Sequence, residues 1–215
     1  MDSKKMSNEI VANSIISQLK KRNIDGEYFD SIKALQEYFS TILSPNKSIA
    51  FGGSQTLNEI GILTYIQEQA LTKSYTLIDR SSALNEEDQR ILFSKTVLAD
   101  YYLMSSNAIT IGGELVNIDG TGNRISALIH GPKQVYLFIG MNKVVSSLDS
   151  AIERIRLKVC PPNATRLNRN TPCKHTGICN ECLSKDCMCN HILITRHSGQ
   201  EHRIKVFLIN DSLGY

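Results

Sequence analysis

Six cysteines lie between positions 160 and 189, and the first 159 residues contain none. Thiolates bind metals tightly, and four of them can hold a tetrahedral zinc ion or a [4Fe–4S] cluster. The same density in a short secreted protein would indicate disulfides, but this chain is neither short nor marked for export. The clustering therefore predicts a metal site, with ordinary packed or free thiols as the alternative.

The part of the chain around these cysteines is basic. Residues 154–205 contain ten Lys or Arg and three Asp or Glu, whereas the rest of the chain is slightly acidic. Positive charge near thiolates lowers their pKa and stabilises bound clusters. No RNA-binding motif or interleaved aromatic residues accompany the charge, so we do not expect a nucleic-acid partner. A solvated basic surface is the alternative.

A second group of side chains that could bind a ligand lies in one short loop. Its polar and glycine residues are Asn117, Asp119, Gly120, Gly122, Asn123 and Arg124. The carboxylate and amides of this loop could orient a polar substrate, and an arginine can grip a carboxylate through two hydrogen bonds. The alternative is a hairpin in which Asn, Asp and Gly only form turns.

A third group follows an apolar run at 48–51, where Gly52, Gly53 and Ser54 precede Thr56. Glycines let a backbone approach a ligand closely, and the free N–H groups at the start of a helix favour an anion. The alternative is a capping box from Thr56 to Glu59, which needs no ligand.

Another apolar run, at 134–140, ends in Gly140 and is followed by Asn142 and Lys143. Lys143 could supply a second cation to a site at the ends of the strands. A solvated lysine is the alternative.

These groups must be positioned by alternating helices and strands. Apolar spacing predicts helices at about 7–20, 28–42, 56–69, 85–99 and 148–158. Short β-branched and aromatic runs predict strands at about 48–51, 75–78, 101–104, 134–140, 191–195 and 203–209, with a hairpin-like stretch at 107–131. Such alternation indicates an α/β fold with a mostly parallel sheet flanked by helices.

Composition narrows the class of protein further. The chain has 215 residues, 41% of them hydrophobic, and a formal charge of +3, which is enough to bury a core and excludes disorder. No apolar run approaches the roughly 18 residues of a membrane span, and the first residues lack a secretory signal, so we expect a cytoplasmic protein with no membrane partner. We expect one domain from residues 1–160 and 190–215, with 160–190 as a cysteine-rich insertion or tail.

Several segments resemble the lactate-utilisation (LUD) domain family, also called DUF162. They are Phe51–Gly61, Asn107–Thr110, Gly113–Arg124, Gly140–Lys143 and Ala151–Arg154, in the family's order, and the likeness runs from about residue 7 to the final Leu213–Tyr215. The resemblance implies a fold similar to ribose-phosphate isomerases, glucosamine-phosphate deaminases and CoA transferases. Related proteins serve in multi-subunit systems that oxidise L-lactate to pyruvate.

The resemblance also implies a ligand pocket and a metal site. The pocket residues would be Gly52, Gly53, Ser54, Thr56 and Glu59, facing Asn117, Asp119, Asn123, Arg124, Asn142 and Lys143. One branch of the family carries a similar tail with four cysteines, which correspond here to Cys173, Cys179, Cys182 and Cys189. Cys160 and Cys187 are then additional thiols, and His175 and His191 flank the segment. An iron–sulfur cluster is favoured over zinc because lactate oxidation is redox chemistry.

Three functions follow as hypotheses. The first is an accessory subunit in the oxidation of L-lactate or a related organic acid, with a small carboxylate or phosphate in the pocket and redox subunits as partners. The second is a stand-alone enzyme of isomerase or CoA-transferase type, with Glu59 or Asp119 as the base and Arg124 or Lys143 stabilising negative charge. The third is a nucleic-acid-binding module built on a zinc knuckle, which salt-dependent binding would reveal.

Overall fold

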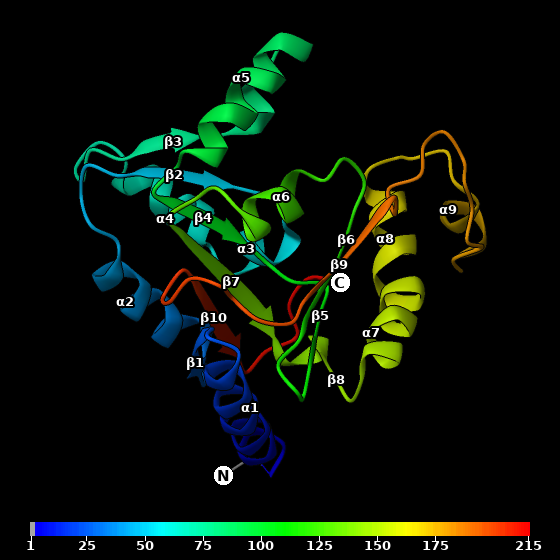
Figure 1. Ribbon diagram of the computed structural model, residues 1–215, viewed down its shortest axis with the longest axis horizontal. Helices are drawn as coiled ribbons and strands as arrows, with labels where there is room; N and C mark the ends of the chain where they lie inside the picture. The colour runs from blue at the N-terminus through cyan, green and yellow to red at the C-terminus, as the bar shows by residue number, and fades with distance from the viewer. Residues whose placement is uncertain (1–2) are drawn as a thin grey trace.

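The largest element of the computed structural model, which describes residues 3–215, is a six-stranded parallel sheet (Figure 1). Its strand order is β1-β10-β7-β4-β2-β3, and every neighbouring pair is parallel. The strands are β1 (Asp25–Phe29), β2 (Ser48–Phe51), β3 (Thr76–Ile78), β4 (Tyr101–Met104), β7 (Gln134–Gly140) and β10 (Ile204–Ile209). The expected α/β fold with a mostly parallel sheet is therefore confirmed.

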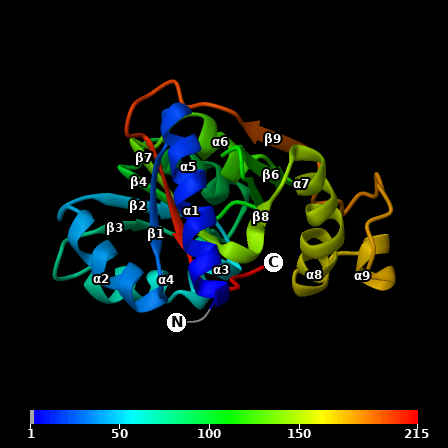
Figure 2. The same cartoon turned by 90° about the horizontal axis from the view of Figure 1, so that it is seen from below.

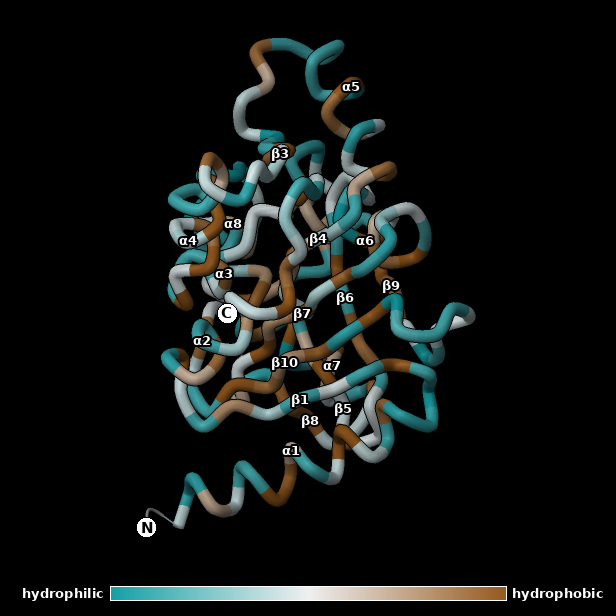
Figure 3. Tube along the Cα trace, turned by 90° about the vertical axis from the view of Figure 1, so that its left-hand side faces the viewer, coloured by the Kyte–Doolittle hydropathy of each residue, from teal (hydrophilic) through white to brown (hydrophobic). Residues whose placement is uncertain are grey.

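Helices cover both faces of this sheet, which is why its central strands are apolar along their whole length. The helices are α1 (Ser3–Lys21), α2 (Ile32–Ile42), α3 (Gln55–Glu59), α4 (Ile62–Gln69), α5 (Glu86–Val97) and α6 (Asn123–Ile129). Buried residues of α1 and α6 pack with Val135 and Leu137 of β7 on one face. Those of α2, α3 and α4 pack with Tyr136 and Phe138 on the other. In Figure 3 the central strands β7 and β10 carry long hydrophobic stretches.

A second, smaller sheet lies beside the large one. Its order is β8-β5-β6-β9, from β5 (Ala108–Thr110), β6 (Leu115–Asp119), β8 (Val144–Val145) and β9 (His191–Thr195). Helix α7 (Leu148–Arg154) continues through a π-helical turn (Ile155–Val159) into α8 (Cys160–Arg166), and α9 (Pro172–Thr176) follows. Buried Ala151, Ile155 and Val159 pack against Val116 and Ile118 of β6. Figure 2 shows these helices on the side of the small sheet away from the large one.

Four local expectations differ from the structure, each for a physical reason. Residues 25–29 form an edge strand rather than leading into a helix, because pairing with β10 outweighs their polar composition. The helix expected at 56–69 is divided at Gly61, which has a left-handed φ of 67°. The end of the hairpin-like stretch is helix α6, and the helix expected to end near 158 continues to Arg166. Among the described residues, no helix combines the length and apolarity that crossing a bilayer requires.

Candidate functional site

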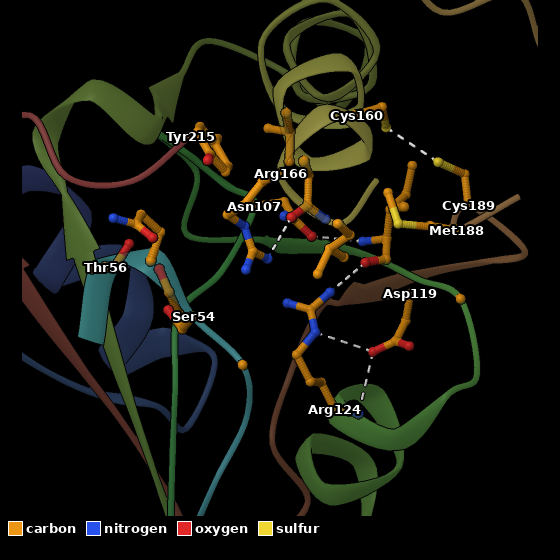
Figure 4. A pocket seen from close by; sticks show the side chains of 18 of the residues that line it. Ser54, Thr56, Asn107, Asp119, Arg124, Cys160, Arg166, Met188, Cys189 and Tyr215 are labelled. Carbon is orange, nitrogen blue, oxygen red and sulfur yellow. Dashed lines mark hydrogen bonds and ion pairs between the residues drawn. The ribbon is translucent and has the colours of Figure 1, made fainter. Parts of the chain in front are cut away.

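A polar cavity lies where the carboxyl ends of β2 and β4 meet the small sheet and α8 (Figure 4). Its volume is about 340 Å³, within the range of small-molecule sites. Its polar and charged lining side chains are Ser54, Gln55, Thr56, Arg80, Ser105, Ser106, Asn107, Asp119, Thr121, Asn123, Arg124, Lys143, Asn163, Arg166, Arg169 and Tyr215. We call this the Arg124 cavity. Its position follows the rule that open α/β sheets bind ligands outside the carboxyl ends of their strands.

The lining of the Arg124 cavity is strongly cationic. Four arginines and one lysine contribute to it, and Asp119 is the one acidic side chain that the described part of the chain adds. The arginines are Arg80, Arg124, Arg166 and Arg169, and the lysine is Lys143. A concave site with such an excess of positive charge raises the local concentration of anions.

Asp119 is already engaged by the protein. Its carboxylate accepts hydrogen bonds from the backbone N–H groups of Thr121 at 3.1 Å, Gly122 at 2.9 Å and Arg124 at 3.2 Å. It also pairs with Nε of Arg124 at 3.2 Å (Figure 4). The carboxylate therefore closes the first turn of α6 and orients the guanidinium. The loop forms a turn and lines the cavity at once, so the two interpretations of its sequence are compatible.

Nη2 of Arg124 donates to the carbonyl oxygen of Ile118, which fixes the other side of the guanidinium. Gly52 is what allows this arginine to lie so close to β2. A Cβ at Gly52 would come within 3.1 Å of Cγ and Cδ of Arg124 and 2.9 Å of the Tyr102 hydroxyl. The close approach at Gly52 is therefore that of protein side chains, and the predicted approach of a ligand stays a prediction.

The other residues of the glycine turn have distinct roles. Gly53 lines the cavity with open space on its Cβ side, and the hydroxyl of Ser54 caps α3 by accepting from the N–H of Leu57 at 3.4 Å. The capping box expected from Thr56 to Glu59 is wrong because the helix begins two residues earlier. Thr56 is instead buried and lines the cavity.

Lys143 is buried in the wall of the Arg124 cavity, with 3% of its surface exposed. Its Nζ lies 2.8 Å from the hydroxyl of Thr56 and 3.0 Å from that of Ser105. Burial, aided by the positive charges of Arg154 and Arg124 and opposed by the negative charge of Glu59, lowers the pKa of this lysine to about 7. The solvated lysine considered from the sequence is therefore wrong.

Four of the expected pocket residues, Gly52, Glu59, Asn117 and Asn142, lie outside the cavity lining. Glu59 is exposed, and its carboxylate accepts from the N–H of Gly214 at 2.6 Å. Asn142 anchors the same terminal segment through the backbone of Leu213. Asn117 is fully buried, and neither atom of its amide has a partner within the described residues.

Asn123 does line the cavity, and so do residues that the sequence reasoning missed. With its oxygen turned toward Arg80, the amide of Asn123 accepts from Nη1 at 2.9 Å. Arg166 and Arg169 belong to the basic segment. Nothing in the sequence of that segment shows that it lines the same cavity as the loop after β6. Ser105 immediately follows β4, and this position at the end of a predicted strand could have indicated that it belongs to the site.

A second cavity, of about 200 Å³, is lined by all six cysteines. We call it the six-cysteine cavity; the thiols are Cys160, Cys173, Cys179, Cys182, Cys187 and Cys189. The Sγ atoms of Cys160 and Cys189 lie 3.2 Å apart (Figure 4). Within residues 3–215, however, no three Cys, His, Asp or Glu side chains take positions that would hold a metal ion.

The two cavities share a wall. Ile118, Cys160, Met188 and Cys189 contribute to both linings. A Cβ at Gly120 would approach the Met188 backbone at 3.3 Å, so this glycine lets the cysteine segment pack against the β6–α6 loop. The thiols therefore adjoin the cationic site, whereas His175 and His191 line neither cavity.

Comparisons with known proteins place the chain in a family. The model of the LUD domain matches residues 12–209. A DUF162 family protein from Deinococcus radiodurans has a similar structure, with a TM-score of 0.52 at 9% identity over 94% of this chain and 98% of that one. eIF2B delta from Chaetomium thermophilum gives a TM-score of 0.37 at 15% identity, over 67% and 54% of the two chains. No curated protein matched this sequence significantly. With the family model spanning nearly the whole chain, the protein belongs to the LUD domain family.

Proposed function

We propose that this protein binds a small organic acid or phosphate in the Arg124 cavity and acts as an accessory subunit in the oxidation of L-lactate or a related acid. Membership of the LUD family supports the class of metabolism. The observation that carries the binding proposal is the lining itself, in which four arginines accompany one carboxylate that is already engaged. A bound anion would balance this charge.

Arg124 is the side chain we expect to grip the ligand. Asp119 and the carbonyl of Ile118 hold its guanidinium in place before any ligand arrives, so little rotamer entropy is lost on binding. Arg166 and Arg169 line the same cavity and add positive charge. A planar guanidinium matches a carboxylate or phosphate through paired hydrogen bonds.

Calorimetric titration of the intact protein with L-lactate, pyruvate and inorganic phosphate tests this proposal. At least one of these anions should bind, and the affinity should fall as salt is raised, because the attraction is electrostatic. Arg124→Met should weaken binding, and Arg90→Met serves as its matched control, since Arg90 is exposed on α5, outside the cavity lining, and pairs with Glu87. The absence of binding by all three anions would contradict the proposal.

For the six-cysteine cavity we propose a metal, either a [4Fe–4S] cluster or zinc, held by Cys173, Cys179, Cys182 and Cys189. What supports this is that all four thiols line one cavity, although their separation means that binding would have to draw them together. A cluster would supply electron transfer at the wall shared with the Arg124 cavity, whereas zinc would be structural.

Anaerobic purification from iron-supplemented cells, with assays of iron, zinc and acid-labile sulfide, tests the metal proposal. Cys182→Ser should lose the metal, and Cys187→Ser should retain it, since Cys187 lies outside the proposed ligand set. Equal metal content in both variants would show that the ligand set is different. Metal-free protein from this preparation would contradict a metal altogether.

We propose a stand-alone enzyme of isomerase or CoA-transferase type as the second candidate. Neither Glu59 nor Asp119 is placed to act as the base. Glu59 is exposed and lies outside the cavity lining, and the carboxylate of Asp119 is held by Arg124 and three N–H groups. The observation that favours an enzyme is buried Lys143. Turnover of a sugar phosphate or an acyl-CoA by the isolated protein would support this candidate against the accessory role.

A further inference from the structure

Lys143 has no role in the binding site proposed above, yet it is the most unusual titratable group in the cavity wall. Burying a charged ammonium is costly unless a carboxylate pairs with it. Within residues 3–215, Lys143 forms no ion pair, and its polar neighbours are the hydroxyls of Thr56 and Ser105. The protein therefore surrounds this nitrogen with groups that suit a neutral amine.

The hydrogen bonds also determine where the lone pair of that amine would point. The Ser105 hydroxyl donates its own hydrogen to the carbonyl of Ser106 at 3.3 Å, so it accepts from Lys143. A neutral amine has two N–H bonds, and Thr56 and Ser105 provide an acceptor for each. The lone pair is then directed away from both hydroxyls and takes part in neither hydrogen bond. Because Lys143 lines the Arg124 cavity, a ligand in that cavity would be its neighbour.

The charges around Lys143 favour the same state. Arg154 donates to the backbone carbonyls of Asn107 and Asn142, and it repels a second positive charge nearby. Arg124 acts in the same direction, while Glu59 opposes them from the exposed side of α3. Since burial is the largest influence, the pKa of Lys143 falls to about 7, and a substantial fraction is unprotonated at neutral pH.

The backbone of the terminal segment passes close to the Thr56–Lys143 pair. Gly214 has a left-handed φ of 57°, and its N–H is bonded to Glu59. A Cβ at this glycine would lie 2.6 Å from Oγ1 of Thr56 and 3.4 Å from Nζ of Lys143. The absence of a side chain at this position is therefore what lets the Thr56–Lys143 pair form.

We propose that Lys143 is a nucleophile that condenses with the carbonyl group of a small anionic ligand in the Arg124 cavity, either a 2-oxo acid or a phosphorylated aldehyde. The nitrogen lone pair attacks the carbonyl carbon, and the C–O π bond breaks to give a carbinolamine. Both hydrogens of the amine leave with the carbonyl oxygen as water, which produces an imine without any oxidant or reductant. This inference rests on the proposed function for recognition of the anionic group by Arg124.

Reductive trapping tests the inference on the full-length protein. Pyruvate is added in one arm and glyceraldehyde 3-phosphate in the other, each with cyanoborohydride, and the adduct is located by peptide mapping. We expect one modified lysine, Lys143, in at least one arm, and the arm that reacts identifies a carboxylate or a phosphate ligand. Trapping should increase as pH rises through about 7, because only the neutral amine attacks.

Two variants accompany the wild-type protein. Lys143→Arg keeps a positive charge but cannot form an imine, so the adduct should disappear. Lys33→Arg should leave trapping unchanged, since Lys33 is exposed on α2 and lies 3.9 Å from Glu37. Should Lys143→Arg fail to fold, the peptide map of the wild-type protein still decides the question.

Ligand-induced thermal stabilisation, measured in the same samples without reductant, separates the two proposals. Stabilisation without an adduct at Lys143, or with adducts spread over exposed lysines, would overturn the inference and leave the proposed function intact. Neither stabilisation nor adduct with either ligand would overturn both.

Discussion

Replacing Arg124 with methionine removes the guanidinium that we expect to grip the ligand, but it also affects folding. Asp119 would lose its ion pair at 3.2 Å while keeping three backbone N–H donors. Because its side chain is only 7% exposed, the free energy of unfolding should fall by about 1–3 kcal/mol, the usual cost of an under-satisfied buried polar group.

The effect of Arg124→Met on ligand binding has a separate magnitude. A hydrogen bond to a charged group contributes about 1.5–3 kcal/mol, which corresponds to a roughly 10- to 150-fold weaker Kd. The double variant Asp119→Asn/Arg124→Met removes the unpaired carboxylate, so it should recover part of the lost stability without recovering affinity. Urea unfolding and calorimetric titration with pyruvate and phosphate measure the two quantities. Wild-type affinity in folded Arg124→Met would refute the role of Arg124.

The remaining predictions concern the core, the lysine and the sheet edge. Phe138→Ala should destabilise the protein by about 3–5 kcal/mol in urea unfolding, because the ring is fully buried; a loss below 1 kcal/mol would contradict its central place in the core. Gly214→Ala should lower thermal stability and weaken trapping at Lys143, because the new Cβ would overlap Thr56; an unchanged melting temperature would contradict that contact. Between pH 7 and 10.5 the unfolded chain holds a proton at Lys143 that the folded chain has lost, so stability should rise with pH, and Lys143→Met should flatten the rise. Hydrogen bonds from Lys133 and Ser48 lower the pKa of Asp100, so its stabilisation should be present above pH 4 and decline as pH falls below it; Asp100→Asn should show no such decline in acid unfolding.

Most of the large sheet could be predicted from local patterns. Runs such as Gln134–Gly140 are apolar, β-branched and aromatic, and they are bounded by Gly or Pro. The pairing partners of each strand could not be predicted, because β10 pairs with β1 from the opposite end of the chain and with β7 across the whole cysteine-rich segment. The short strand Asp25–Phe29 exists through that pairing rather than through its own composition.

In the candidate site, the cavity-lining residues that could be predicted belong to local motifs, and those that could not come from distant segments. Arg124 lies in a loop whose glycines and polar residues indicate a bent backbone around a ligand. Arg80 and Arg166 reach the same cavity from distant segments, and nothing near them in the sequence indicates it. Glu59 was expected in the pocket or in a capping box at the start of the helix. The helix begins at Gln55, so Glu59 lies at its end and its carboxylate contacts the terminal segment instead.

The most direct test of the central claim is a crystal structure of the protein grown with saturating pyruvate, with a parallel crystal grown in phosphate. We expect an anion in the Arg124 cavity, within hydrogen-bond distance of the Arg124 guanidinium and adjacent to Lys143. Well-ordered crystals with no anion in this cavity, or with the anion bound elsewhere, would contradict it.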